Sequence, residues 1–210
     1  MYYGGRFYLS YYDAVDEKST SFDLVASYKT KWFTVNLDGF HQVISDKITR
    51  VKIPGDAMGR SQNANVGDVS FDGVEAWGKV KLTTRLEGFA GYAGVFRAEQ
   101  DPGDGATEDF KLIYEHQLTG GFITRITPKF AVSGSAKYLS RWEDAAAYGL
   151  LNGRLIYRPL AKEDLELSFD VNNILDNRVE VPEIARDNDA VPTLPKTEAR
   201  RFFGSMSYSF

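Results

Sequence analysis

The sequence predicts an all-β chain whose antiparallel strands cross a bacterial outer membrane as part of a β-barrel. Apolar and polar side chains alternate along most of the 210 residues, and tyrosine and phenylalanine are abundant, with 12 and 14 copies. Short and long connections also alternate between the predicted strands. A barrel strand meets lipid on one face and the lumen on the other, which gives this period of two. We therefore expect about ten strands, in a single domain over residues 1–210.

The final strand, residues 201–210, shows the alternation most clearly. Its apolar face carries Phe202, Gly204, Met206, Tyr208 and Phe210, whereas the opposite face is mostly serine. An outer-membrane strand needs an apolar face toward lipid, small polar residues toward the lumen and aromatic residues near the headgroups.

Nine earlier segments show the same alternation. They cover residues 2–12, 21–29, 33–51, 62–82, 88–97, 110–126, 130–142, 148–158 and 165–172. The segments 33–51 and 62–82 are long enough to project beyond the bilayer as continuous strands. Both faces of 88–97 are largely apolar, so the alternation does not reveal its lipid-facing side.

The predicted connections fall into two length classes. The short ones are 30–31, 83–87, 127–129 and 159–164, and the long ones are 13–18, 54–61, 98–109 and 175–198. Outer-membrane barrels have short periplasmic turns and long extracellular loops. We assign the two classes to these two sides and expect 175–198 to be a polar, proline-bearing loop.

Composition excludes several classes of protein. The net charge is −4 with a pI near 5.3, which argues against a nucleic-acid partner, since that requires a basic surface. The absence of cysteine excludes disulfides and thiolate metal sites. No run approaches the roughly 18–20 apolar residues of a membrane helix.

Few residues are candidates for chemistry, and we expect no enzyme activity and no cofactor. His41 and His116 are the only histidines and are far apart in sequence, so solvated polar contacts are expected rather than a metal or catalytic site. The acidic, glycine-rich segment 99–105 lacks the spacing of an EF-hand calcium loop. Arg200 and Arg201 are expected as lumenal or headgroup-level charges.

Charged residues on the polar faces are expected to pair across neighbouring strands. These are Glu75, Lys79, Lys81, Lys137, Arg154, Glu166 and Asp170.

Two motifs near the end of the chain resemble the end of a TonB-dependent outer-membrane receptor. Residues 171–178, Val-Asn-Asn-Ile-Leu-Asp-Asn-Arg, resemble a Val-x-Asn-Leu-Phe-Asp segment, and residues 199–210 resemble the last strand of that family. Ile174-Leu175 replaces the usual Leu-Phe, and Ala199 replaces the usual glycine. The hairpin segment 19–48 and the Gly-Val-Glu at 73–75 are also similar to the family.

The resemblance implies the C-terminal part of a 22-stranded barrel that an N-terminal plug domain fills. Such receptors import siderophores, cobalamin or carbohydrates, with energy supplied by TonB. No plug is recognisable in the 210 residues, so TonB would act only through that missing domain. The implied partners are outer-membrane lipid, the barrel-assembly machinery and a small-molecule or metal-chelate ligand, with Phe202, Tyr208 and Phe210 as an assembly signal.

Two other functions remain open from the sequence. The first is a complete ten-stranded outer-membrane barrel, acting as a pore or as an omptin-like protease that would use His41 and the nearby Asp46. The second is a soluble ligand-binding β-barrel, whose apolar faces would point inward.

Overall fold

The computed structural model describes residues 15–52, 61–101, 107–110, 114–142, 145–159, 165–182, 193–195 and 199–209. Its strands are β1 (Lys18–Lys29), β2 (Phe33–Ser45), β3 (Ile48–Lys52), β4 (Ser61–Asn65), β5 (Asp68–Lys81), β6 (Leu86–Asp101), β7 (Glu108–Asp109), β8 (His116–Arg125), β9 (Phe130–Leu139), β10 (Tyr148–Tyr157), β11 (Leu165–Asn172), β12 (Glu180–Pro182), β13 (Thr193–Pro195) and β14 (Arg201–Tyr208). Within these residues, no helix is both long and apolar enough to cross a membrane.

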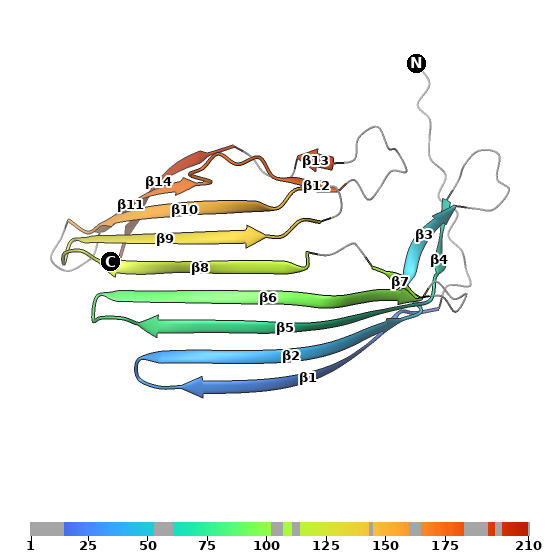
Figure 1. Cartoon of the computed structure of the whole chain (residues 1–210). Coiled ribbons are helices and arrows are strands. Elements are labelled where there is room, and N and C mark those ends of the chain that lie inside the picture. Colours follow the sequence, from blue (N-terminus) through green and yellow to red (C-terminus); the bar gives the residue numbers. More distant parts are fainter. Residues whose placement is uncertain are drawn as a thin grey trace, which may run out of the picture. The chain divides into compact units, whose positions relative to one another are not determined.

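Ten strands form one sheet in the order β1-β2-β5-β6-β8-β9-β10-β11-β14, with β7 paired to β6 (Figure 1). The pairs from β6 through β14 are antiparallel. Two hairpins, β3-β4 and β12-β13, form separate two-stranded sheets. The all-β antiparallel prediction is confirmed. The described sheet is open, because β1 and β14 each have a single neighbour in this order.

The chain divides into two compact units. The first comprises Met1–Asp23, Phe40–Asp72 and Phe96–Phe110, and the second comprises Leu24–Gly39, Gly73–Val95 and Lys111–Phe210.

In the second unit, strand register separates an apolar face from a polar face. Leu155 of β10 aligns with Val132 of β9 and Phe169 of β11. One residue earlier, Arg154 aligns with Ser133 and Asp170 on the same two neighbours. Because successive side chains point to opposite faces, these two rows define an apolar and a polar surface.

Register also assigns the faces of 88–97, which the sequence left open. Phe89 of β6 aligns with Gly121 of β8, and Gly121 aligns with Ser135 of β9. Ser135 lies on the polar face, two residues from Ser133, so Phe89 lies there too. Ala90 and Tyr92 therefore belong to the apolar face.

Two predicted long strands are broken in the structure. The segment 33–51 divides into β2 and β3 at Asp46, whose φ of 56° leaves the extended region. The segment 62–82 divides into β4 and β5 around Gly67, with φ of 77°. The prediction of continuous strands was wrong here because β3 and β4 pair with each other and leave the main sheet.

Other predicted boundaries shift as well. The strand expected over 110–126 begins at His116, and β1 begins at Lys18. The predicted loops 98–109 and 175–198 contain strand pairs, β6-β7 and β12-β13, that local polarity concealed. The predicted strand 2–12 lies outside the described residues.

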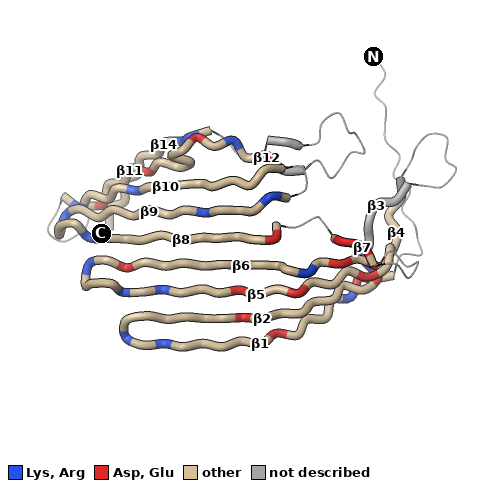
Figure 2. Tube along the Cα trace, in the orientation of Figure 1, with Lys and Arg blue, Asp and Glu red and all other residues tan. Residues whose placement is uncertain are grey.

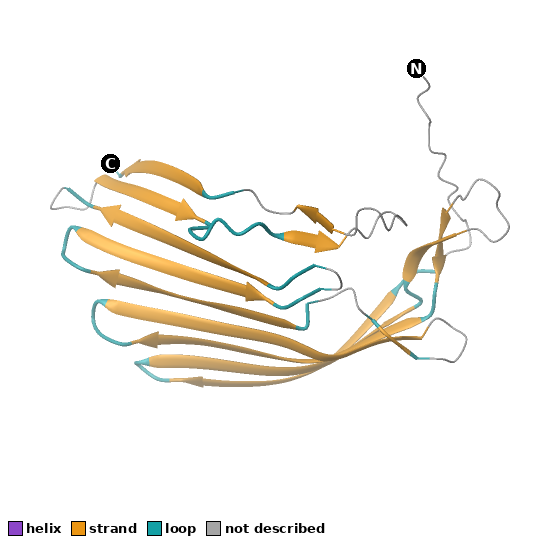
Figure 3. Cartoon of the chain, turned by 45° about the horizontal axis from the view of Figure 1, so that its top comes forward, coloured by secondary structure: helices purple, strands orange, loops and turns teal. Residues whose placement is uncertain are grey.

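Figure 3 draws the turns between strands in teal. Three of the short turns share one hydrogen-bond pattern. In each, a threonine hydroxyl oxygen accepts from the backbone N–H groups of the second and third residues after it. The threonines are Thr30, Thr83 and Thr127, and the N···O distances lie between 3.0 and 3.2 Å. Such side-chain caps fix a turn by satisfying donors that the strand ladder leaves free.

Gly121 fills a position in β8 that has no room for a side chain. A Cβ atom there would lie 2.6 Å from the carbonyl oxygen of Gly134 and 2.8 Å from the Phe89 ring. Because the closer atom belongs to the backbone, it cannot move without distorting β9. We expect Gly121→Ala to destabilise the protein by about 1–3 kcal/mol, measured as thermal unfolding in detergent.

The neighbouring Gly120 provides the matched control. A Cβ atom at Gly120 would come no closer than 3.4 Å, to the carbonyl oxygen of Phe89. Gly120→Ala is expected to leave the unfolding temperature nearly unchanged. Equal losses in the two variants would contradict the predicted close approach at Gly121.

Candidate functional site

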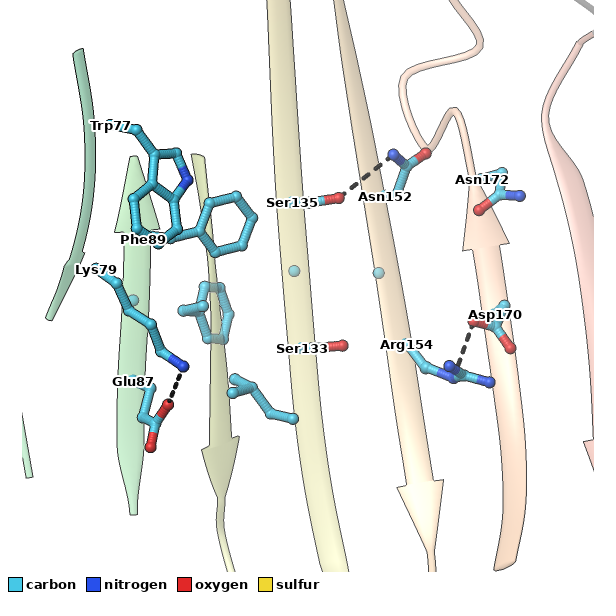
Figure 4. A pocket seen from close by; sticks show the side chains of 15 residues that line it. Trp77, Lys79, Glu87, Phe89, Ser133, Ser135, Asn152, Arg154, Asp170 and Asn172 are labelled. Atoms are coloured by element: carbon cyan, nitrogen blue, oxygen red, sulfur yellow. Dashed lines mark hydrogen bonds and ion pairs between the residues drawn. The ribbon is translucent and has the colours of Figure 1, made fainter. Parts of the chain in front are cut away.

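The polar face of the second unit carries a groove of about 700 Å³ (Figure 4). Six strands from β5 to β11 contribute to it. Its lining residues are Trp77, Lys79, Glu87, Gly88, Phe89, Phe122, Ile123, Ser133, Gly134, Ser135, Asn152, Gly153, Arg154, Asp170 and Asn172.

Two cross-strand ion pairs lie in this groove. At one side, Lys79 Nζ lies 3.1 Å from Glu87 Oε2, and Lys81 Nζ lies 3.8 Å from the other oxygen of Glu87. At the other side, Arg154 Nε lies 3.1 Å from Asp170 Oδ1 (Figure 4). All of these side chains are partly exposed, so solvent screens the pairs and they contribute little to stability. Their main effect is to neutralise the charges of the groove.

The rest of the groove offers hydrogen-bonding groups and aromatic surface. The Asn152 amide donates to the Ser135 hydroxyl at 3.4 Å, while Trp77 and Phe89 supply rings (Figure 4). Paired charges, amides, hydroxyls and two aromatic side chains can contact a polar or ring-bearing solute.

The structure confirms the cross-strand pairing predicted for five charged residues and supplies two partners that the sequence analysis missed. The confirmed residues are Lys79, Lys81, Arg154, Glu166 and Asp170. The first is Glu87, which the sequence placed in a turn. The second is Arg158, which binds Glu166 at 2.8 Å and was not among the residues expected to pair. Glu75 and Lys137 form no ion pair within the described part of the chain.

A buried asparagine, Asn173, organises the turn that follows β11. It is 7% exposed and adopts φ of 52°. Its amide donates to the Asn177 carbonyl at 2.9 Å, and its side-chain oxygen accepts from the Asn177 N–H at 3.0 Å. Its own N–H donates to the Asn152 side chain at 3.0 Å, which links the turn to β10. Asparagine tolerates this left-handed conformation better than most residues.

In the first unit, His41 contacts a carboxylate other than the one considered from sequence. Its Nδ1 lies 2.7 Å from Asp72 Oδ1, and Arg97 lies 3.7 Å from the second oxygen of Asp72. The Asp46 backbone N–H instead donates to Asp68. His41 therefore belongs to an ion-pair network with Asp72, Arg97 and Glu99, whose carboxylate lies 2.8 Å from Arg97.

His116 lies in the second unit, on the apolar face, where its Nδ1 is 2.9 Å from the Tyr92 hydroxyl. The two rings are stacked, with centroids 6.1 Å apart. The two histidines thus contact different side chains in different units.

The acidic segment 99–105 is described only through Asp101. Glu99 and Gln100 are part of β6 and align with Asp109 and Glu108 of β7. No group of three metal-ligating side chains occurs among the described residues. Nearby, Lys47 lies over the Phe110 ring at 3.9 Å. Burial lowers the pKa of Lys47, and the charge of Glu17 acts in the opposite direction.

The described candidate residues near the end of the chain lie in β14 or directly before it. The Arg200 N–H donates to Asp176 at 2.8 Å, and the Arg201 guanidinium lies 5.6 Å from the Phe203 ring. Phe202 and Tyr208 are 60% and 52% exposed on the apolar face, where they align with Val171 and Leu165 of β11. Phe210 lies outside the described residues.

Comparison with protein families identifies the family to which this chain belongs. The family model described as "TonB dependent receptor-like, beta-barrel" matches residues 2–174. The chain belongs to the TonB-dependent receptor family. It is therefore part of an outer-membrane protein from a family of receptors and transporters, and neither the omptin-like protease nor the soluble barrel is favoured.

Solved structures of TonB-dependent receptors share the fold. The copper transporter OprC superimposes with a TM-score of 0.75 at 19% identity, covering 94% of this chain and 32% of OprC. The ferric-catecholate import receptor Fiu from E. coli K12 superimposes with a TM-score of 0.68 at 18% identity. The match covers 92% of this chain and 28% of Fiu. The iron transporter FrpB from Neisseria meningitidis superimposes with a TM-score of 0.69 at 16% identity. The match covers 96% of this chain and 32% of FrpB.

This chain spans about a third of the length of these receptors. A search of curated proteins finds no match. With the family established, the polar face is the lumenal face of a barrel wall, and the apolar face is the lipid-facing one.

Proposed function

We propose that the chain forms one barrel domain, part of the wall of a receptor that takes up a small-molecule or metal-chelate ligand across the outer membrane. Energy would come from TonB through a plug domain, which the described residues do not form. The groove on the lumenal face is the observation that supports this function. It combines neutralised charges with the Trp77 and Phe89 rings and the Asn152 amide.

The names of similar receptors indicate which ligands to test. They refer to copper, ferric catecholate and iron. A groove whose cations are already paired has little excess charge to attract either an anionic chelate or a free cation, so hydrogen bonding and ring contact would determine selectivity.

Uptake by the complete receptor in a bacterial strain tests this function. Cells expressing the receptor would be given labelled ferric enterobactin, copper(II), cyanocobalamin or a maltodextrin, each with and without TonB. We expect one class to accumulate in a TonB-dependent manner. TonB-independent passage of all four would indicate a pore and contradict the proposal.

Variants of the groove connect uptake to this wall. Trp77→Ala combined with Asn152→Ala is expected to raise the half-saturating ligand concentration about tenfold, the effect of losing roughly 1.4 kcal/mol of contact. The control is Val80→Ala, on the lipid-facing side of β5. If the double variant folds normally and its half-saturating concentration is unchanged, the groove does not contact the ligand during uptake.

We further propose that Phe202, Tyr208 and Phe210 form an assembly signal for the barrel-assembly machinery, with outer-membrane lipid as the second partner. The exposed rings of Phe202 and Tyr208 on one face of β14 support this. A variant with all three residues changed to serine is expected to lose membrane insertion. A variant with Ser205 and Ser207 changed to alanine is expected to insert normally.

A further inference from the structure

Three hairpin tips in the second unit carry a positive charge that has no counter-ion among the described residues. Lys31 lies between β1 and β2, Arg85 between β5 and β6, and Lys129 between β8 and β9. All three are exposed, and none forms an ion pair with another described residue. Figure 2 shows basic residues at the tips of these hairpins. We call these three residues the basic turn row.

Three cations outside the basic turn row are neutralised by a partner, whereas Lys137 forms no ion pair with a described residue. Lys79, Arg154 and Arg158 each form an ion pair with a carboxylate on the neighbouring strand. Glu87 and Glu166 are used in these pairs. Among the described residues, no carboxylate pairs with the charges at the tips, which leaves these charges available to an external anion.

Exposed apolar side chains adjoin each tip. Trp32 and Phe33 follow Lys31, with 54% and 39% exposure. Leu82 precedes the second tip and is 61% exposed. Ile126 and Phe130 flank the third and are 57% and 39% exposed. A cation at the edge of such an apolar band lies at the depth of lipid headgroups.

The tips are also held in defined conformations. Each threonine cap fixes the backbone N–H groups immediately around the basic residue. The Lys31 ammonium lies 5.3 Å from the Trp32 ring centroid, a cation–π geometry that keeps the charge beside the apolar band.

We propose that the basic turn row binds the anionic headgroups of phospholipids in the periplasmic leaflet. Short turns of outer-membrane barrels face the periplasm, where the leaflet is made of phospholipid. Each basic residue at an anionic membrane surface contributes attraction that weakens with salt. This inference concerns the lipid around the barrel and holds whichever ligand the receptor transports.

Lipid binding by the complete receptor provides the test. The purified receptor would be depleted of lipid in detergent, and phosphatidylglycerol or phosphatidylethanolamine would then be titrated in, with bound lipids counted by native mass spectrometry. We expect selective retention of phosphatidylglycerol. The combined variant Lys31→Gln, Arg85→Gln and Lys129→Gln is expected to weaken that binding about tenfold or more.

A second triple variant controls for net charge. Lys18→Gln, Lys137→Gln and Arg178→Gln remove the same charge from exposed positions outside these turns and should leave phosphatidylglycerol binding unchanged. Equal loss in both triple variants, or no loss in the first, would overturn the proposal. Inorganic phosphate should neither bind nor compete at matched concentration, and competition by it would indicate a simple anion site instead of a lipid site.

Discussion

Replacing Leu155 with arginine is expected to destabilise the receptor by about 1–2 kcal/mol, because Leu155 lies on the lipid-facing side two residues before the end of β10, between the midplane, where a cation costs most, and the interface. Leu155 lies in a row with Val132 and Phe169 on the apolar face, and 43% of its surface is exposed in this chain. The temperature at which the folded, fast-migrating form disappears on a gel should fall.

Leu150 in the same strand is the matched control. It aligns with Lys137, two residues from Ser135, and thus lies on the lumenal face. Leu150→Arg places the same charge against water, where repulsion from Lys137 costs less than about 1 kcal/mol. A larger loss for Leu150→Arg than for Leu155→Arg would mean that the two faces have been assigned the wrong way round.

Asn173→Ala is expected to cost about 3 kcal/mol, because it leaves the Asn177 N–H and carbonyl without their partners and puts alanine in a left-handed conformation. The Asn173 side chain makes both of these hydrogen bonds within the turn after β11. Since Arg200 binds Asp176 in the same turn, the approach to β14 should loosen. Hydrogen exchange of β11 and β14 amides would measure this.

Asn173→Asp separates the two contributions. Aspartate keeps the oxygen that accepts from the Asn177 N–H and tolerates the same φ, but it loses the donor to the Asn177 carbonyl. An intermediate loss is expected. If Asn173→Ala exchanges at the wild-type rate, the turn is held by other contacts, and the role assigned to the Asn173 side chain in this turn is wrong.

The turn at Asn173 gives physical meaning to part of the sequence resemblance. The Val-x-Asn-like segment at residues 171–173 places an asparagine where the chain leaves β11 and needs both a left-handed φ and a side-chain cap. The Leu-Phe and glycine positions that differ in this chain, at Ile174-Leu175 and Ala199, do not carry those hydrogen bonds.

The sequence by itself determined the fold class and most of the strands. Alternation along β5, β9, β10, β11 and β14 is a local property, since it follows from the two-residue period of an extended chain. The same period placed Lys79, Arg154 and Asp170 on one face before any pairing was known. The short turns were evident from the loss of alternation around Thr30, Thr83 and Thr127.

Only the tertiary structure decided what depends on register. The lipid-facing side of β6 was settled by alignment of Phe89 with Gly121 in β8, and His41 was matched with Asp72, 31 positions away, instead of nearby Asp46. The breaks at Asp46 and Gly67 arise because β3 and β4 pair with each other. A shift of one residue in register exchanges the two faces of a strand, and the period within one strand contains no information about its neighbour.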